Sequence, residues 1–130
     1  MRLQGYFDSF QGTDELVDSE VLSQATATEP YPPLLVAIAA LADGSTTAPG
    51  LASLFVRIEG VSIEASNPDA PKDFDESLLF GGLRLDDLLY PELDNLYPVG
   101  SMFRAVEGIA GFSFEHQKLY PRGARDLTLP

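Results

Sequence analysis

The sequence has no cysteine, no tryptophan, a single histidine, and only 8 basic residues against 20 acidic ones. Without cysteine the chain can form neither a disulfide framework nor a thiolate metal site, which leaves the compartment open with a lean towards the cytosol. Its formal net charge of −12 repels phosphate backbones and anionic lipid, so binding of nucleic acid or membrane through a basic face is excluded. The acidity itself is compatible with solubility, with a salt-adapted host or with a basic partner.

Long apolar runs are also missing. The longest, residues 34–42, spans nine residues, whereas a membrane-spanning helix needs about 20. The N-terminal segment is acidic and has no apolar stretch of the kind found in secretion signals. We therefore expect no membrane partner and no secretion signal.

Patterns typical of catalysis, of metal binding and of phosphate binding are absent as well. His116 stands alone in a polar stretch, and the sequence lacks the Gly-x-Ser-x-Gly turn that would supply a nucleophile, so we expect an ordinary surface or loop histidine. The acidic residues 69–76 lack the order of a calcium-binding loop. Gly81 and Gly82 lack the residues that complete a phosphate-binding loop. The prediction is a protein that is not an enzyme and that holds neither a metal nor a cofactor.

What the sequence does contain is enough apolar material for one core. It has 130 residues, 45% of them hydrophobic, together with 11 glycines and 10 prolines. This length fits one domain, and the frequent glycine and proline favour short strands and long loops over long helices. We expect a mainly β fold: a small β-rich single domain with short helical turns and an extended N-terminal arm. The expected parts are the arm at residues 1–33, the core domain at 34–114 and a C-terminal extension at 115–130.

The expected arm combines acidic character with apolar side chains that an unbound polar tail would not need. It ends in Glu29-Pro-Tyr-Pro-Pro33, where each proline restricts the residue before it to extended conformations. Such an arm can add a strand to a partner's sheet, and packing on its own domain is an equal alternative. The candidate partner-binding residues are Tyr6, Phe7, Phe10, Leu16 and Val17.

Residues 54–64 carry the clearest strand pattern of the core domain. Apolar and polar side chains alternate from Leu54, and Gly60 can reset the phase of this alternation before Val61. Residues 34–42 are ambiguous, because a short run that is apolar throughout fits a buried strand or a helix.

Further segments complete the predicted core. Residues 78–85 predict one strand that a glycine pair interrupts, and residues 109–114 predict the closing strand. Between them, Asp86 and Asp87 are placed to begin a short helix that Pro91 would end. No clear period follows residue 114.

Two stretches of the core resemble a known family. Residues 82–92, Gly-Leu-Arg-Leu-Asp-Asp-Leu-Leu-Tyr-Pro-Glu, are similar to a stretch of the lambda-type bacteriophage head decoration proteins, in which Gly-x-Phe-Arg runs into an acidic pair, Val-Leu, an aromatic residue, proline and glutamate. Residues 104–114 look like the same family's arginine-led run of small residues, which ends in a final strand. The residues that would shape this structural module are Gly82, Arg84, Asp86, Asp87, Tyr90 and Pro91.

The resemblance implies a virion structural protein that acts as a capsid cement. Such a protein trimerises, sits on three-fold sites of the expanded shell, and has an N-terminal arm that becomes ordered by adding to a strand of the major capsid protein. It would be made in the host cytoplasm and end on the capsid surface of the virion. Two alternatives stay open: an acidic inhibitor or immunity-type protein that blocks a basic site, and another phage structural protein of the neck or tail.

Overall fold

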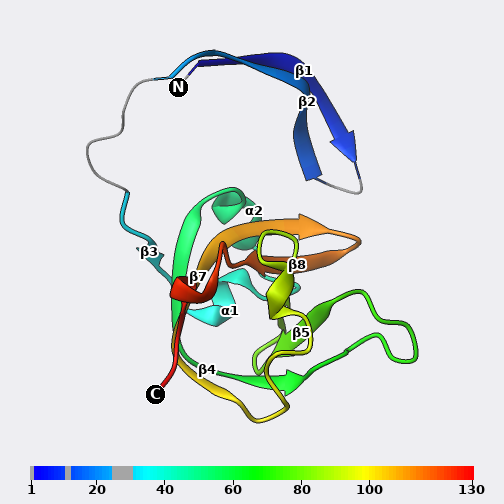
Figure 1. Cartoon of the computed structure of the whole chain (residues 1–130), viewed down its shortest axis with the longest axis vertical. Helices are drawn as coiled ribbons and strands as arrows, with labels where there is room; N and C mark the ends of the chain where they lie inside the picture. The colour runs from blue at the N-terminus through cyan, green and yellow to red at the C-terminus, as the bar shows by residue number, and fades with distance from the viewer. Residues whose placement is uncertain (1, 11–12, 25–30) are drawn as a thin grey trace.

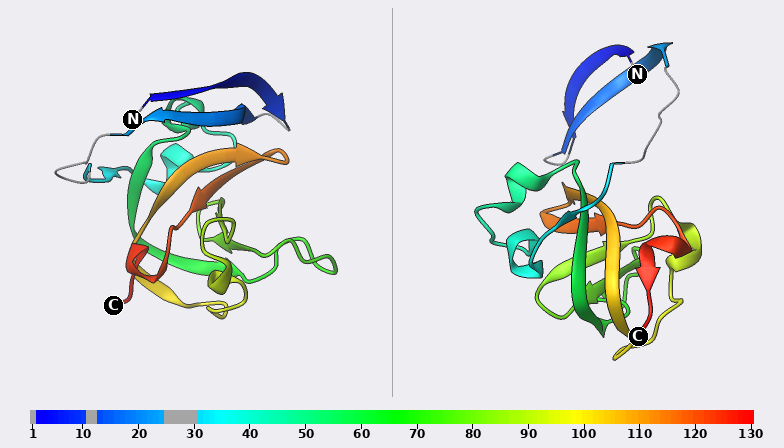
Figure 2. Two further views of the ribbon diagram at one scale, coloured as in Figure 1. Left: turned by 45° about the horizontal axis from the view of Figure 1, so that its top comes forward. Right: turned by 90° about the vertical axis from the view of Figure 1, so that its left-hand side faces the viewer.

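The computed structural model describes residues 2–10, 13–24 and 31–130, and it contains two sheets of different size (Figure 1). The small sheet is an antiparallel hairpin of β1 (Arg2–Phe10) and β2 (Thr13–Ser23). Figures 1 and 2 show this hairpin outside the larger sheet. The expected extended arm is therefore folded back on itself, and the start of its proline-rich end lies outside the described residues.

The large sheet holds seven strands and forms the body of the protein. Its strands are β3 (Leu34–Leu35), β4 (Phe55–Ala65), β5 (Glu76–Leu79), β6 (Leu83–Asp86), β7 (Met102–Ser113), β8 (His116–Tyr120) and β9 (Leu127–Thr128). The helical segments are α1 (Ile38–Leu41), α2 (Ala48–Leu51), η1 (Pro91–Leu93) and η2 (Ala124–Asp126). The predicted mainly β fold with short helical turns is confirmed. Within the described part of the chain, no helix has the length and hydropathy needed to cross a membrane.

Five of these strands close into a ring. β4 pairs with β5 and with β7, β5 pairs with β6, and β8 lies between β6 and β7. The pairing of β6 with β8 is parallel, and the others in the ring are antiparallel. Counted from β4, the order around the ring is 1-2-3-5-4-1. This is the connectivity of the OB-fold, a five-stranded barrel that supports many different functions.

The apolar core lies inside the ring, and β4 shows how the sequence directs side chains into it. Val56 and Ile58 are buried, Gly60 has a φ of 64°, and Val61 and Ile63 are buried after it. The inward positions thus change from even to odd numbers at the glycine, and the predicted phase reset is confirmed. The other strands of the ring contribute Leu79, Leu83, Leu85, Phe103, Val106 and Leu119.

The single strand predicted at residues 78–85 is in fact two strands. Gly81 and Gly82 have φ angles of 113° and 83°, which residues with a side chain rarely adopt, and they turn the chain between β5 and β6. The prediction was wrong because a glycine pair fits a tight turn as well as an irregular strand.

The helix predicted from Asp86 is a turn. The Oδ1 atom of Asp86 accepts a hydrogen bond of 2.9 Å from the backbone N–H of Leu88. Pro91 then begins the short η1 segment instead of ending a helix. The prediction was wrong because an aspartate side chain satisfies a backbone N–H in a turn as readily as at a helix start.

The local sequence pattern did not indicate which secondary structure two segments adopt. Residues 34–42 begin with the short strand β3, whose side chains are exposed and not buried as expected, and continue two residues later with α1. Residues 115–130 supply β8 and β9, and β8 lies between two strands of the ring, so these residues belong to the body rather than extend from it. Their strands form through pairing with distant segments, and a local period does not reveal such pairing.

Gly108 lies where β7 passes close to β8. A Cβ atom here would lie 2.7 Å from the carbonyl oxygen of Tyr120. We expect Gly108→Ala to lower the free energy of unfolding by about 1–3 kcal/mol, because the backbone must move to admit the methyl group. Urea unfolding measures the change. Gly123→Ala is the control, since a Cβ there would have no heavy atom within 4 Å, and equal midpoints for the two variants would contradict the close approach.

Candidate functional site

The hairpin places four of the five predicted partner-binding residues in cross-strand pairs. Tyr6 lies opposite Val17, and Phe7 lies opposite Leu16. Because neighbouring residues of a strand point to opposite faces, each face of the hairpin carries one pair of an aromatic and an aliphatic side chain. The fifth residue, Phe10, is the last residue of β1.

The aromatic side chains of the hairpin are open to solvent. Tyr6 is 72% exposed, Phe7 75% and Phe10 56%. A two-stranded hairpin on its own is marginally stable in water, and an exposed apolar surface is typical of interaction sites. Among the described residues, β1 and β2 pair only with each other, so each has one free edge. These properties are those of a docking element.

The hairpin touches the body near the end of β1 and the start of β2. The ring of Phe10 packs edge-to-face against the ring of Phe114, with their centres 6.5 Å apart. Asp14 borders a hollow that is also lined by Pro49 and Phe112. The contact with the body is therefore made by the end of the hairpin, and the aromatic pairs further along it stay uncovered.

The hairpin is also acidic. Its described residues carry five acidic side chains and one basic side chain, Arg2. Asp8 lies directly opposite Glu15 in the strand pairing. Like charges at opposite positions repel each other and destabilise a hairpin, so this element depends on contacts beyond its own two strands.

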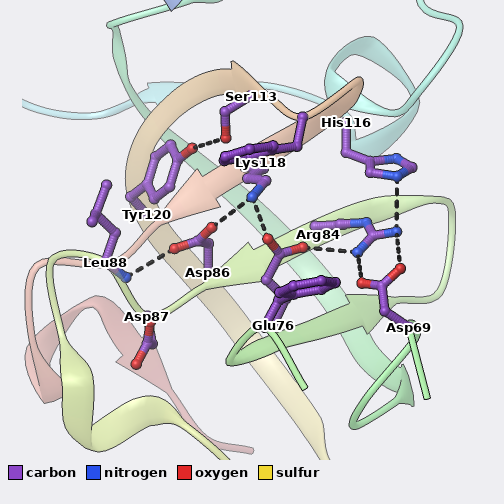
Figure 3. A pocket seen from close by; sticks show the side chains of 12 residues that line it. Asp69, Glu76, Arg84, Asp86, Asp87, Leu88, Ser113, His116, Lys118 and Tyr120 are labelled. Atoms are coloured by element: carbon purple, nitrogen blue, oxygen red, sulfur yellow. Dashed lines mark hydrogen bonds and ion pairs between the residues drawn. The ribbon is translucent and has the colours of Figure 1, made fainter. Parts of the chain in front are cut away.

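A second candidate site lies where β5, β6 and β8 meet, and it consists of buried charges (Figure 3). Lys118 of β8 is 4% exposed and donates hydrogen bonds to Glu76 of β5 and, at 2.9 Å, to Asp86 of β6. Arg84 of β6 donates to the other oxygen of Glu76 at 2.8 Å. The parallel pairing of β6 with β8 puts Arg84 beside Lys118. Glu76 therefore holds two cations together, and we call these four residues the charge cluster.

Arg84 connects the charge cluster to His116. It donates to both carboxylate oxygens of Asp69, and its Nη2 lies 2.9 Å from His116 Nε2. An arginine can only donate, so Nε2 is the acceptor and the proton of the neutral imidazole is on Nδ1, 2.8 Å from Asp43 Oδ2. His116 is thus a neutral link between Arg84 and Asp43, and not the ordinary surface or loop residue that we expected.

The charge cluster lines a cavity of about 410 Å³. The walls also include the apolar or aromatic side chains of Phe74, Leu88, Phe114 and Tyr120. Phe74 and Phe114 are 58% and 60% exposed, which puts them at the mouth of the cavity. The Nζ atom of Lys118 lies 5.6 Å from the centre of the Phe114 ring. The volume is in the range of small-molecule sites.

The shifted pKa values of Asp69 and Lys118 favour their charged forms. Hydrogen bonds from Arg84 lower the pKa of Asp69. Burial disfavours the charge of Lys118, but its hydrogen bonds to Glu76 and Asp86 outweigh burial and raise its pKa overall. Ion pairs therefore persist at neutral pH on this side of the body.

Acid should destabilise the protein through two aspartates whose pKa is lowered. Arg84 lowers the pKa of Asp69; burial opposes the charge of Asp126, but hydrogen bonds from Arg122 outweigh burial and lower its pKa. An aspartate with a folded pKa below the unfolded value of about 3.9 stabilises the fold above that pH, and loses this contribution as the pH falls through its folded pKa. We expect the melting temperature to fall steeply below about pH 4.

Thermal unfolding followed by circular dichroism measures this acid response. Asp126→Asn removes one of the two groups, so its melting temperature should fall less steeply below about pH 4 than that of the wild type. Glu92→Gln, which changes an exposed carboxylate, is the control and should follow the wild type. A wild-type slope for Asp126→Asn would show that this ion pair does not cause the acid response.

The structural module predicted within residues 82–92 is divided among several places in the fold. Gly82 turns the chain, Arg84 and Asp86 belong to the charge cluster, Asp87 lines the cavity, Tyr90 packs against the core and Pro91 begins η1. The residues that bind Arg84 and Asp86 could not be found from the sequence, because no spacing of residues connects them with Arg84 or Asp86. One weak indication in the sequence that Lys118 lies in a partly buried strand is its place directly before the apolar Leu119 and the aromatic Tyr120.

One group of described residues has the geometry to hold a metal ion. The carboxylate oxygens of Asp73, Asp75 and Asp94 lie within 4.8 Å of one another. All three residues are exposed, and exposed acidic groups of this kind are common without a metal. We therefore assign no metal to them.

The geometry defines a small β-rich protein with an exposed hairpin and a buried charge cluster beside a cavity. Comparisons with known proteins add no family: no protein-family model matches the chain, and neither the curated proteins nor the solved structures contain a match.

Proposed function

We propose that this protein is a capsid decoration protein, which binds the outside of a phage shell and stabilises it. The observation that carries the proposal is the β1–β2 hairpin, whose aromatic side chains are exposed and whose outer edges pair with no other described strand. The resemblance of residues 82–92 and 104–114 to the lambda-type decoration proteins supports the same class. The partner would be the major capsid protein, and the site of action the surface of the virion.

The hairpin would bind by strand addition. A free strand edge presents a row of N–H and C=O groups, and a strand of the shell can pair with them while Tyr6 or Phe7 is buried against it. Burying one large apolar side chain stabilises a complex by about 1.5–3 kcal/mol. Binding would thus supply the stability that a two-stranded hairpin lacks by itself.

Assembly of three copies is part of the proposal. Large apolar side chains are exposed on the body as well as on the hairpin. From β3 onward, the large apolar side chains that are more than 60% exposed are Leu35, Phe80, Leu88, Val99 and Met102. Neighbouring copies would cover part of this surface and present three hairpins to one shell, so that modest contacts add through multivalency.

Removal of the hairpin tests the proposal. We expect a chain that lacks residues 1–29 to fold, because the ring of strands contains the apolar core, and to lose its binding to shells. Cosedimentation with empty expanded shells of the phage that encodes the protein measures binding, and circular dichroism checks the fold. Normal binding by the truncated chain would refute docking through the hairpin.

An acidic inhibitor that blocks a basic site is the rival from another class, because a net charge of −12 suits such a role. Salt separates the two functions. Association of oppositely charged surfaces weakens steeply between low and physiological ionic strength, whereas strand addition and apolar burial are less sensitive. Binding to shells that persists at physiological salt supports decoration, whereas no binding to shells, together with salt-sensitive binding to a basic protein, supports the inhibitor.

A further inference from the structure

The cavity beside the charge cluster is a feature that docking through the hairpin does not use. Its volume of about 410 Å³ suits a small ligand. Side chains from the loop before β5, from four strands, from the segment after β6 and from the β7–β8 turn surround it (Figure 3). Phe74 and Phe114 stand at its mouth, and Tyr120 is half-buried further along the wall. The cavity is therefore both accessible and built from distant parts of the chain.

The cations of the lining are already engaged. Arg84 donates hydrogen bonds to two carboxylates and to His116, and Lys118 donates to two carboxylates. An anionic ligand would have to break these bonds and leave a buried carboxylate without its cation, which is costly. The lining therefore disfavours phosphate, carboxylate and other anionic groups.

Carboxylates outnumber cations around the cavity. The carboxylates are Asp69, Glu76, Asp86 and Asp87, and the cations are Arg84 and Lys118. Among the described residues, Asp87 receives no hydrogen bond from a basic side chain, unlike the other three. Burial raises the pKa of Asp87, and the nearby Asp75 and Asp86 raise it further. The cavity thus has a negative field that the protein does not neutralise.

Aromatic side chains in the lining also favour a positively charged ligand. The face of an aromatic ring attracts a cation within about 6 Å of its centre. Phe114 already has the Lys118 ammonium 5.6 Å from its centre, and Phe74 and Tyr120 offer further rings in the lining. We propose that this cavity binds a small organic cation with an apolar body, such as an alkylammonium or a guanidinium group, with Asp87 as its counter-charge.

Three probes of one shape and different charge test the proposal on the full-length protein by isothermal titration calorimetry. Choline carries a positive charge, 3,3-dimethylbutan-1-ol is its neutral counterpart, and 3,3-dimethylbutanoate is the anion. We expect choline to bind about tenfold or more tightly than the neutral alcohol, and the anion not to bind. Equal affinities for choline and the alcohol, or no binding of choline at millimolar concentration, would overturn the proposal.

Two variants identify the residues that hold the cation. Asp87→Asn should weaken choline binding about threefold or more, because it removes the unpaired negative charge. Glu64→Gln removes one charge from an exposed position outside the lining and should leave binding unchanged. Phe74→Leu keeps an apolar wall and removes the ring, so it should weaken choline and spare the alcohol. Unchanged choline binding in Asp87→Asn would overturn the assignment.

A free metabolite and a basic side chain of a partner protein share this chemistry. N-acetyl-lysine methylamide and N-acetyl-arginine methylamide, titrated beside choline, distinguish these sources. Tighter binding of either amide than of choline assigns the cavity to a partner side chain, and the reverse order assigns it to a small molecule. Because these titrations do not measure binding to shells, their failure would leave the proposed docking function standing.

Discussion

Lys118→Met is expected to lower the free energy of unfolding by about 3–5 kcal/mol, the usual cost of removing one member of a buried ion pair. Lys118 is 4% exposed, and its partners Glu76 and Asp86 are each 8% exposed. Methionine replaces the apolar stem of the lysine and not its charge. The change leaves Asp86 without a cation and Glu76 with Arg84 alone. Urea unfolding followed by circular dichroism measures the loss.

Lys72→Met provides the matched control, because Lys72 is the other lysine of the chain and is exposed. Its effect should stay within about 0.5 kcal/mol. The double variant Glu76→Gln/Lys118→Met should recover part of the stability, since a glutamine needs no counter-charge. If the two lysine variants unfold at the same urea concentration, the charge cluster does not stabilise the fold.

Replacing Tyr6 and Phe7 together by alanine removes the aromatic side chain of both hairpin faces and is expected to weaken binding to shells by about 30-fold. The face that meets the shell loses one aromatic hot-spot residue, which contributes about 2 kcal/mol, and 1.4 kcal/mol corresponds to a tenfold change in affinity. The side chains are 72% and 75% exposed, so their removal should leave the fold unchanged. Cosedimentation over a range of protein concentrations gives the two dissociation constants, and the melting temperature reports on the fold.

Tyr31→Ala is the control for this loss of aromatic surface. Tyr31 is 92% exposed and lies outside the hairpin, just before β3. Its replacement should change shell binding by less than about threefold, as expected for a residue outside the contact. Equal losses in the two variants would mean that general apolar surface, and not the hairpin, binds the shell.

The parts of the fold that could be predicted from sequence are those set by local alternation. The pattern of β4, including the change of phase at Gly60, follows from residues that are neighbours in the chain. The frequent glycine and proline correctly predicted short helical segments, but β4 and β7, with 11 and 12 residues, are longer than the short strands that we expected. The hairpin was expected only as an extended arm, because register shifts at Arg2/Leu3 and Gln4/Tyr6 interrupt the alternation that would reveal two paired strands.

The closed ring and the charge cluster could not be predicted, because both arise from pairing between distant segments. β8 was taken as part of an extension, yet its pairing with β6 brings Lys118 to Arg84, 34 positions earlier in the chain. Glu76 reaches them only because the glycine turn folds β5 against β6. Arg84 and Asp86 were named as residues of a structural module, but their partners in the charge cluster depend on topology that no motif encodes.

Hydrogen–deuterium exchange of the protein, free and bound to expanded shells, tests docking through the hairpin most directly. If β1 or β2 adds to a strand of the shell, backbone amides within residues 2–10 or 13–23 should exchange quickly in the free protein and slowly in the complex. Amides within the closed ring should change little. Unchanged exchange of the hairpin in a complex that protects the ring instead would contradict the proposed function.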